Sequence, residues 1–254
     1  MTSPNRKNIK NADKALLWAR SGGVCCFPDC SVVCVEEANE GDPAAVIGQI
    51  AHIEAYSNKG PRANRSLSNE ERNSYANLIL LCPTHHRQVD AQENTYSDET
   101  LKGWKSERES IYQNFLTQEM GNITFAELET VTQALVGGVV PSPNSMTVIP
   151  PQEKMERNGL TNQTAILLNI GFLQSRQVQQ FVETMGGLDT TFTTRLTSGF
   201  INEYQRQRQA RLEGDALFEA MRLFSSQGRT DIRYQCAGLA VLVYLFERCE
   251  VFEP

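Results

Sequence analysis

The chain has 254 residues, of which 40% are hydrophobic, and it carries a formal net charge of -6. This length allows one large core or two small ones, and the negative charge argues against a general polyanion binder with a basic surface. The N-terminus is polar and no apolar run reaches the roughly 18 residues that a bilayer span needs. We therefore expect a soluble, cytoplasmic protein with no membrane partner.

The first part of the chain, residues 1–117, has the pattern of a small mixed α+β module. Its periodicities predict two helices, Asn11–Ser21 and Asp98–Phe115, and two strands, Val46–Ile53 and Ala76–Leu81. In the second helix one apolar stripe is expected to face the core, and it consists of Leu101, Trp104, Ile111 and Phe115.

Residues 118–160 are predicted to form a helix followed by a linker. The stretch Val136–Leu160 contains two adjacent glycines and four prolines, a composition that breaks helices. From 161 to 254 we expect a mainly α-helical domain, with helices at Gln163–Leu173, Arg176–Met185, Thr191–Arg211, Asp215–Ser225 and Asp231–Glu247. The apolar run Ala237–Phe246 predicts a helix, carrying Leu242 and Leu245, that is buried on most sides or packed against another chain.

The residues able to bind metal or move protons are concentrated in the first part. All three histidines and five of the seven cysteines lie between Cys25 and His86. In a cytoplasmic protein such a cluster is typical of a metal site rather than of disulfides.

Two short motifs have the spacing of zinc knuckles. Cys25 and Cys30 enclose a Phe-Pro-Asp turn, and Cys82 and His85 form a Cys-x-x-His step after a strand. Together they supply the four ligands of a closed, structural Zn²⁺ site, which ties two turns of a small module together. Cys26 is an alternative to Cys25 as the fourth ligand.

The other two histidines are candidates for chemistry. His52 ends one predicted strand and His86 begins a short helix, so both can project into one groove. His86 and Asp90 lie at i and i+4, on one helix face, and can share a divalent cation. A neutral imidazole suits a general base near neutral pH, and the amide of Asn77 can fix a loop by hydrogen bonds.

These residues resemble the HNH endonuclease family, whose ββα-metal fold is a two-stranded hairpin and a helix around one metal ion. The resemblance covers about residues 15–110 and lies in Ala51-His52-Ile53, Asn77–Cys82 and His85-His86. It implies that His52 is the general base, that Asn77 organises the loop around it, and that His86 holds a catalytic Mg²⁺ or Mn²⁺.

The chain departs from the family pattern at two places. His85 stands where a cysteine is usual, which zinc tolerates. Ala51 stands where many members have an acid that binds the catalytic metal, so that metal is expected to rest on His86 with help from Asp90 or Glu54. The run from Gly60 to Asp90 looks most like HNH effectors of bacterial antiphage defence systems, some of which also have this alanine.

The resemblance implies an endonuclease that hydrolyses phosphodiester bonds of double-stranded DNA. Lys59, Arg62 and Arg65 lie in a stretch without acids and are expected to contact the DNA backbone. The end of the chain faintly resembles C-terminal domains of three-component conflict systems with an ABC-type ATPase. We expect the helical half to form a homo-oligomer or to dock an ATPase or sensor partner; the alternative function is an inactive, zinc-stabilised nucleic-acid-binding or adaptor protein.

Overall fold

The computed structural model describes residues 9–36, 40–136, 151–248 and 251–252. The chain forms two compact units, Met1–Tyr112 and Gln113–Pro254, and their boundary falls within helix α4 (Asp98–Met120). Most of the predicted glycine- and proline-containing linker, residues 137–150, lies outside the described residues. Among the residues that are described, no helix combines the length and the apolar character of a membrane span.

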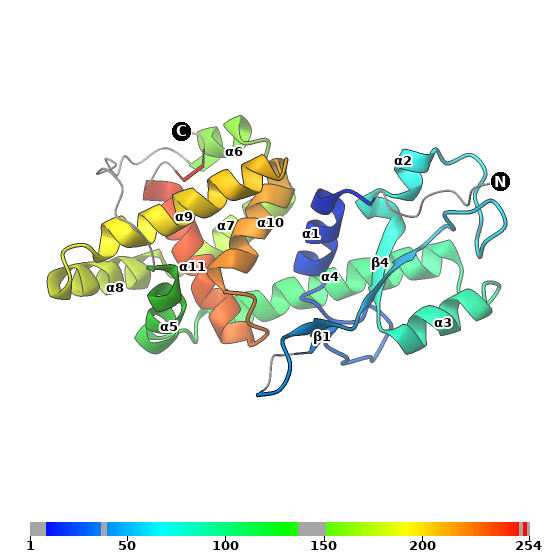
Figure 1. Ribbon diagram of the computed structural model, residues 1–254, viewed down its shortest axis with the longest axis horizontal. Helices are drawn as coiled ribbons and strands as arrows, with labels where there is room; N and C mark the ends of the chain where they lie inside the picture. The colour runs from blue at the N-terminus through cyan, green and yellow to red at the C-terminus, as the bar shows by residue number, and fades with distance from the viewer. Residues whose placement is uncertain (1–8, 37–39, 137–150, 249–250, 253–254) are drawn as a thin grey trace. The chain divides into compact units, whose positions relative to one another are not determined.

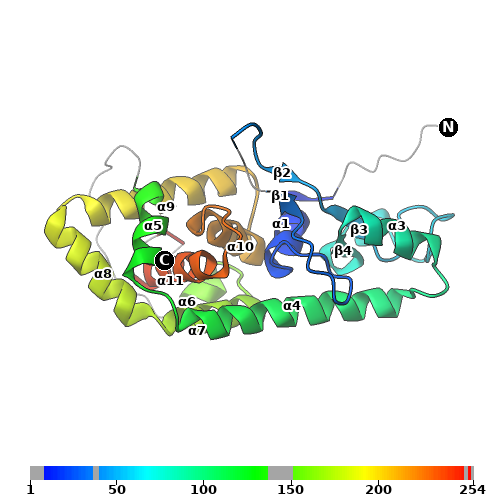
Figure 2. The same cartoon turned by 90° about the horizontal axis from the view of Figure 1, so that it is seen from below.

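The first unit is a small α+β module built on two antiparallel strands, β3 (Gln49–His52) and β4 (Leu78–Leu81) (Figure 2). Their register places Gln49 opposite Leu81 and His52 opposite Leu78. Around them lie α1 (Asn11–Arg20), β1 (Val35–Glu36), β2 (Ala45–Val46), α2 (Asn69–Arg72), the 3-10 turn η1 (Tyr75–Asn77), α3 (Pro83–Ala91) and the start of α4.

The two strands differ in burial because they face different surroundings. All four side chains of β4 are fully buried, as its continuous apolar sequence requires. In β3 the small Ala51 faces the core, whereas Ile50 and His52 point to the other side and are partly exposed. Helix α3 begins with Pro83 in its first turn, where no amide hydrogen is needed, and packs on both strands through the fully buried Val89.

Helix α4 buries a different face from the one that its apolar residues predict. Leu101 is fully buried, but Ile111 and Phe115 are 38% and 48% exposed, and Lys105 and Tyr112 are buried instead. Lys105 donates a hydrogen bond to the backbone oxygen of Tyr75 and lies over that ring, 3.4 Å from its centre. The polar end of the lysine thus has a partner inside the module, which lets its long aliphatic stem occupy a core position. Burial lowers the pKa of Lys105 to about 8.

Helices are the regular elements among the described residues of the second unit, and α11 (Ile232–Arg248) forms its centre (Figure 1). Side chains from Cys236 to Phe246 are almost completely buried by the helices of the same chain. Leu242 and Leu245 are therefore core residues rather than residues that await a second subunit. The helices that pack on α11 are α5 (Phe125–Leu135), α7 (Asn162–Phe172), α8 (Ser175–Leu188) and α10 (Gly214–Ser225), and α9 (Phe192–Gln209) packs on α5, α8 and α10.

A further helix, α6 (Pro151–Arg157), lies inside the stretch for which a linker is predicted. Its Lys154 is completely buried and donates a hydrogen bond of 2.8 Å to the backbone oxygen of Phe246, near the end of α11. That carbonyl has no partner within its own helix, because the last carbonyls of a helix never do. The last part of the predicted linker is thus a packed element of the second unit.

We predict that Gly238→Ala destabilises the protein by about 1–3 kcal/mol, the usual effect of overpacking. A Cβ at Gly238 of α11 would lie 2.7 Å from backbone atoms of Ser225 and Ser226 at the end of α10, closer than van der Waals contact allows. Gly187→Ala in α8 is the matched control, because nothing lies within 4 Å of its added Cβ. That control should be neutral or stabilising by up to about 1 kcal/mol. Urea unfolding of both variants measures the difference, and equal stabilities would contradict the packing of α10 on α11.

Candidate metal centre and active-site groove

Four soft or borderline ligand atoms meet at one point in the first unit. They belong to Cys25, Cys30, Cys82 and His85, and all lie within 4.8 Å of one another. The Nδ1 atom of His85 is 3.2 Å from the sulfur of Cys82 and 3.6 Å from that of Cys25. Bond lengths of about 2.3 Å for Zn–S and 2.0 Å for Zn–N place tetrahedral ligands roughly 3.5–3.8 Å apart. The cluster therefore has the composition and the spacing that Zn²⁺ requires.

The backbone decides between the two neighbouring cysteines. The Phe-Pro-Asp turn is closed by a hydrogen bond from the Cys30 amide to the Phe27 oxygen. This turn brings the sulfur atoms of Cys25 and Cys30 close together. Cys26 instead donates its amide hydrogen to Leu80 of β4 and buries its side chain in the hydrophobic core, outside the cluster. Burial raises the pKa of the Cys25 thiol, so a positive ion is needed to hold it as a thiolate.

Aromatic side chains support the cluster from one side. The ring of Phe27 stacks on the imidazole of His85 with centroids 3.9 Å apart and planes only 4° from parallel. Trp104 and Tyr96 pack around Phe27 in turn. The orientation of the His85 ring is thus fixed by packing, which is what a metal ligand needs in order to be preorganised.

His52 ends β3 and is held by an amide. Its Nε2 atom lies 3.0 Å from Oδ1 of Asn73, a buried residue just after α2. Because a carboxamide oxygen only accepts hydrogen bonds, Nε2 carries the hydrogen and the lone pair of the neutral ring is on Nδ1. Sequence reasoning missed Asn73, since an asparagine at a helix end is ordinarily explained as a cap.

Asn77 fixes the chain that follows His52. Its side-chain oxygen accepts from the amide of Glu54, and its side-chain nitrogen donates to the carbonyl oxygens of Glu54 and Arg72, at 2.8–2.9 Å. Its backbone oxygen accepts from the amide of Ile53. All polar atoms of this buried amide are used, so Asn77 holds the segment after His52 against the loop that carries Asn73.

His86 and Asp90 lie one turn apart on α3, as their spacing predicts. Nε2 of His86 is 3.4 Å from Oδ2 of Asp90, whose other oxygen accepts a hydrogen bond of 2.8 Å from Arg62. Burial alone would raise the pKa of Asp90, but the interactions of its carboxylate with His86 and Arg62 outweigh burial and lower that pKa. An ionised oxygen and an imidazole nitrogen at this separation can both bind one divalent cation.

His52, His86 and Asp90 line one groove of about 260 Å³. The strand contributes His52 and the helix contributes the other two, so the side chains come from different elements. The rest of the lining consists of Ile9, Ile50, Ala55, Tyr56, Ser57, Gly60 and Pro61. The Tyr56 ring lies 5.7 Å from that of His52, centre to centre.

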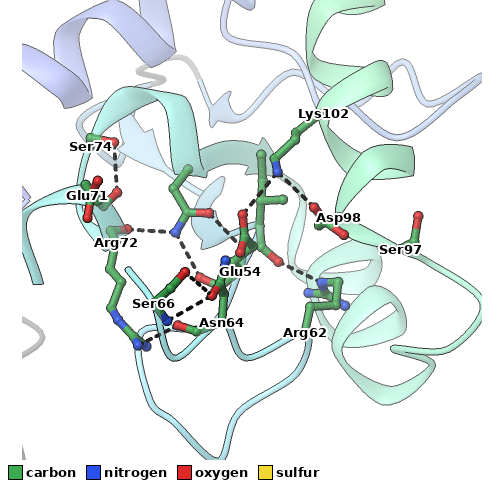
Figure 3. Close-up of polar contacts among 12 residues, drawn as sticks. Glu54, Arg62, Asn64, Ser66, Glu71, Arg72, Ser74, Ser97, Asp98 and Lys102 are labelled. Atoms are coloured by element: carbon green, nitrogen blue, oxygen red, sulfur yellow. Dashed lines mark hydrogen bonds and ion pairs between the residues drawn. The ribbon is translucent and has the colours of Figure 1, made fainter. Parts of the chain in front are cut away.

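The position of the missing family acid does not face this groove. Ala51 is 1% exposed and packs in the hydrophobic core. Glu54, the other carboxylate considered for the metal, binds Lys102 at 3.0 Å, and Lys102 also binds Asp98 (Figure 3). Asp90 is therefore the carboxylate that accompanies His86, and Glu54 belongs to a separate ion-pair network.

Arg62 does not fit the DNA contact that its charge suggests. Its side chain is 5% exposed, and its guanidinium donates to the carbonyl oxygens of Ile53 and Val89 and to Asp90. A guanidinium committed in this way does not reach a phosphate without unfolding the loop. Lys59 and Arg65 are exposed and remain candidates.

A second buried arginine, which sequence reasoning missed, organises the same loop. Arg72 is 4% exposed and donates to the carbonyl oxygens of Ala55, Tyr56, Asn64 and Leu67 and to the Asn58 side chain. Figure 3 shows its side chain reaching from α2 toward Asn64. Nothing in the sequence around Arg72 distinguishes it from a solvated arginine on a short polar helix.

We predict that Cys25→Ala and Cys26→Ala have different effects, because Cys25 is a zinc ligand and Cys26 is a core residue. Cys25→Ala should remove bound zinc and lower the unfolding temperature, because three ligands hold a structural zinc poorly. Cys26→Ala should keep about one zinc per chain and lose only packing energy, about 1–2 kcal/mol. Elemental analysis with thermal unfolding checks both variants. If zinc is kept in the first variant and lost in the second, the ligand assignment is wrong.

Comparison with known families identifies the segment that carries the groove. No curated protein matches the chain. Residues 30–93 match a family model described as HNH endonuclease. That segment contains His52, Asn77, His86 and Asp90 and begins at Cys30. The chain is thus similar to the HNH endonuclease family over residues 30–93.

Proposed function

We propose that the protein is a metal-dependent endonuclease that hydrolyses DNA phosphodiester bonds, with His52 as the general base. The observation that carries the proposal is the groove into which β3 presents His52 while α3 presents His86 and Asp90. A base and a pair of metal-binding groups that line one groove suit the attack of water on a phosphate.

Two metal sites with different roles belong to the proposal. Zn²⁺ would be held by Cys25, Cys30, Cys82 and His85 and would tie the two knuckles together. Mg²⁺ or Mn²⁺ would be held by His86 and Asp90, with water and phosphate oxygens as the remaining ligands. Bound there, such an ion neutralises the negative charge that develops on the phosphate during attack.

The side chains of the groove divide the remaining work. His52 takes a proton from the attacking water at Nδ1, the water oxygen bonds to phosphorus, and the leaving oxygen departs and is protonated by solvent. The hydrogen bond from Nε2 to Asn73 fixes the tautomer and stabilises the imidazolium that forms. Asn77 keeps His52 in place through the segment that follows it.

The proposed substrate and setting of the enzyme rest on resemblance to known families. Double-stranded DNA is the proposed substrate because the domain family is named for endonucleases and because its resemblance implies duplex cleavage. A role as an effector of bacterial antiphage defence rests on the sequence resemblance of residues 60–90 alone. Homo-oligomerisation, or docking of an ATPase or sensor, is proposed for the helical second unit, and any such surface lies outside the buried helix α11.

We predict that His52→Ala lowers the rate of plasmid nicking by about 10²- to 10⁴-fold, the usual contribution of a general base. Wild-type nicking should require Mg²⁺ or Mn²⁺ and stop with EDTA. DNA binding, measured by fluorescence anisotropy, and zinc content should be unchanged. His52 is not a ligand in the zinc cluster, and it is not one of the exposed basic residues, Lys59 and Arg65, that are proposed to contact DNA.

Asn73→Asp is the companion variant, since it keeps a hydrogen-bond acceptor beside Nε2 and should retain much more activity than Asn73→Leu. Full nicking by His52→Ala would exclude this residue as the base. Absence of nicking by the wild type under all metal conditions would favour the inactive nucleic-acid-binding alternative.

We also predict that Lys59→Ala and Arg65→Ala weaken DNA binding without changing zinc content. Each lost phosphate contact should reduce the slope of log affinity against log salt by about 1. Arg62→Ala should instead lower stability, since its guanidinium holds two buried carbonyl groups and Asp90. Salt titrations of DNA affinity decide the matter: an unchanged slope in both exposed-residue variants would remove these side chains from the interface.

A further inference from the structure

We propose that Gln49 is a positioning residue that sets the tautomer of His86 and thereby aims its Nε2 lone pair at the catalytic metal position. Oε1 of Gln49 lies 2.6 Å from Nδ1 of His86. No feature of the HNH-like motifs points to Gln49, which stands three residues before His52 at the start of β3. The inference deepens the proposed function, on which its metal part rests.

The chemistry of the contact fixes where the imidazole hydrogen is. A carboxamide oxygen accepts hydrogen bonds and cannot donate them, so a contact with Nδ1 at this distance requires hydrogen on Nδ1. In the neutral ring the lone pair is then on Nε2, the only other nitrogen. This nitrogen faces Oδ2 of Asp90 at 3.4 Å.

In the neutral ring this lone pair faces a carboxylate oxygen, and the two repel unless a proton or a metal cation lies between them. Oδ1 of Asp90 is already bound by Arg62, which leaves Oδ2 as the oxygen directed at His86. Gln49 and Arg62 therefore have similar effects on the two metal-binding groups. Gln49 occupies Nδ1 of His86 and Arg62 occupies Oδ1 of Asp90, which leaves Nε2 and Oδ2 for a cation. Outer partners of this kind typically change metal affinity by about 10- to 100-fold.

The fold keeps Gln49 in this position independently of the metal. Gln49 is opposite Leu81 in the strand pair, and His86 begins the second turn of α3, which packs on β3 and β4. The contact joins residues 37 positions apart in the chain. The strand thus supplies the base at one end and the orienting amide at the other.

Two substitutions separate hydrogen bonding from shape. Gln49→Met keeps a side chain of similar length but has no strong acceptor, whereas Gln49→Glu keeps an acceptor oxygen. Because the chain has only three histidines, long-range ¹H–¹⁵N spectra of zinc-loaded, full-length protein contain three imidazoles. His86→Ala assigns the signal. Mildly alkaline buffer keeps free imidazole neutral, and the spectra are recorded there without divalent ions other than zinc.

We expect the wild type and Gln49→Glu to have His86 protonated on Nδ1, and Gln49→Met to lose this preference. A wild-type His86 protonated on Nε2, or an unchanged tautomer in Gln49→Met, would overturn the inference. The zinc content should be the same in all variants, which shows that any change is not a failure to fold.

The second measurement is the affinity for Mn²⁺ alone, by calorimetry or electron paramagnetic resonance, with no DNA present. Gln49→Met should bind Mn²⁺ about tenfold or more weakly than wild type, and Gln49→Glu should bind at least as tightly. Equal Mn²⁺ binding by wild type and His86→Ala would refute the proposed metal site itself. Loss of binding in His86→Ala together with wild-type binding in Gln49→Met would refute only the role of Gln49.

Discussion

The antiparallel pairing of β3 with the fully buried strand β4 positions both halves of the candidate site. Pairing places His52 at the end of β3 beside Asn77, which directly precedes β4, and brings the other end of β4 to Cys82 in the metal cluster. The amide of Cys26 also donates to Leu80 of β4. A one-residue slip would turn His52 into the core and Ala51 into the groove, so the buried apolar face of this short sheet sets the register of the chemistry.

The loop between His52 and β4 depends on charged side chains that point inward. Arg62 and Arg72 are both buried and donate mainly to backbone carbonyl oxygens, in a segment with few apolar residues. Hydrogen bonds from charged donors contribute about 1.5–3 kcal/mol each, and unpaired buried carbonyls are costly. The two guanidinium groups therefore replace a hydrophobic core in this loop. This explains how a polar loop can hold Asn73 beside His52 and can present Arg62 to Asp90 on α3.

Sequence reasoning succeeded where local spacing determines geometry. The two knuckles and the helical step from His86 to Asp90 are each set by residues close in sequence, and each of the two strands is indicated by its own short apolar pattern. It failed where burial depends on distant partners. Arg62 has the same charge as the exposed Arg65, and only contacts with Ile53 and Val89 turn it inward. Lys105 is buried, against hydropathy, because Tyr75 offers the lysine an acceptor, whereas Phe115 on the same helix is exposed.

The same limit applies to Lys154, which lies in a stretch with the composition of a linker. Its charge and the neighbouring prolines suggest that its side chain is exposed to solvent. The ammonium group is instead buried and donates a hydrogen bond to a backbone carbonyl near the end of α11. Asn73 and Gln49 are a further example, since amides are common on any surface. Only the positions of the two imidazoles reveal what these amides do.

The alanine before His52 follows from the same strand geometry and does not argue against catalysis. Neighbouring residues in a strand point to opposite faces, and here the face of Ala51 is the hydrophobic core. A carboxylate at this position would be buried among apolar side chains without a partner, which is strongly unfavourable. Asp90 lies on α3 with His86, so a single helical turn sets the spacing of the proposed metal ligands. Their orientation then depends on residues outside that helix, namely Arg62 from the loop and Gln49 from β3.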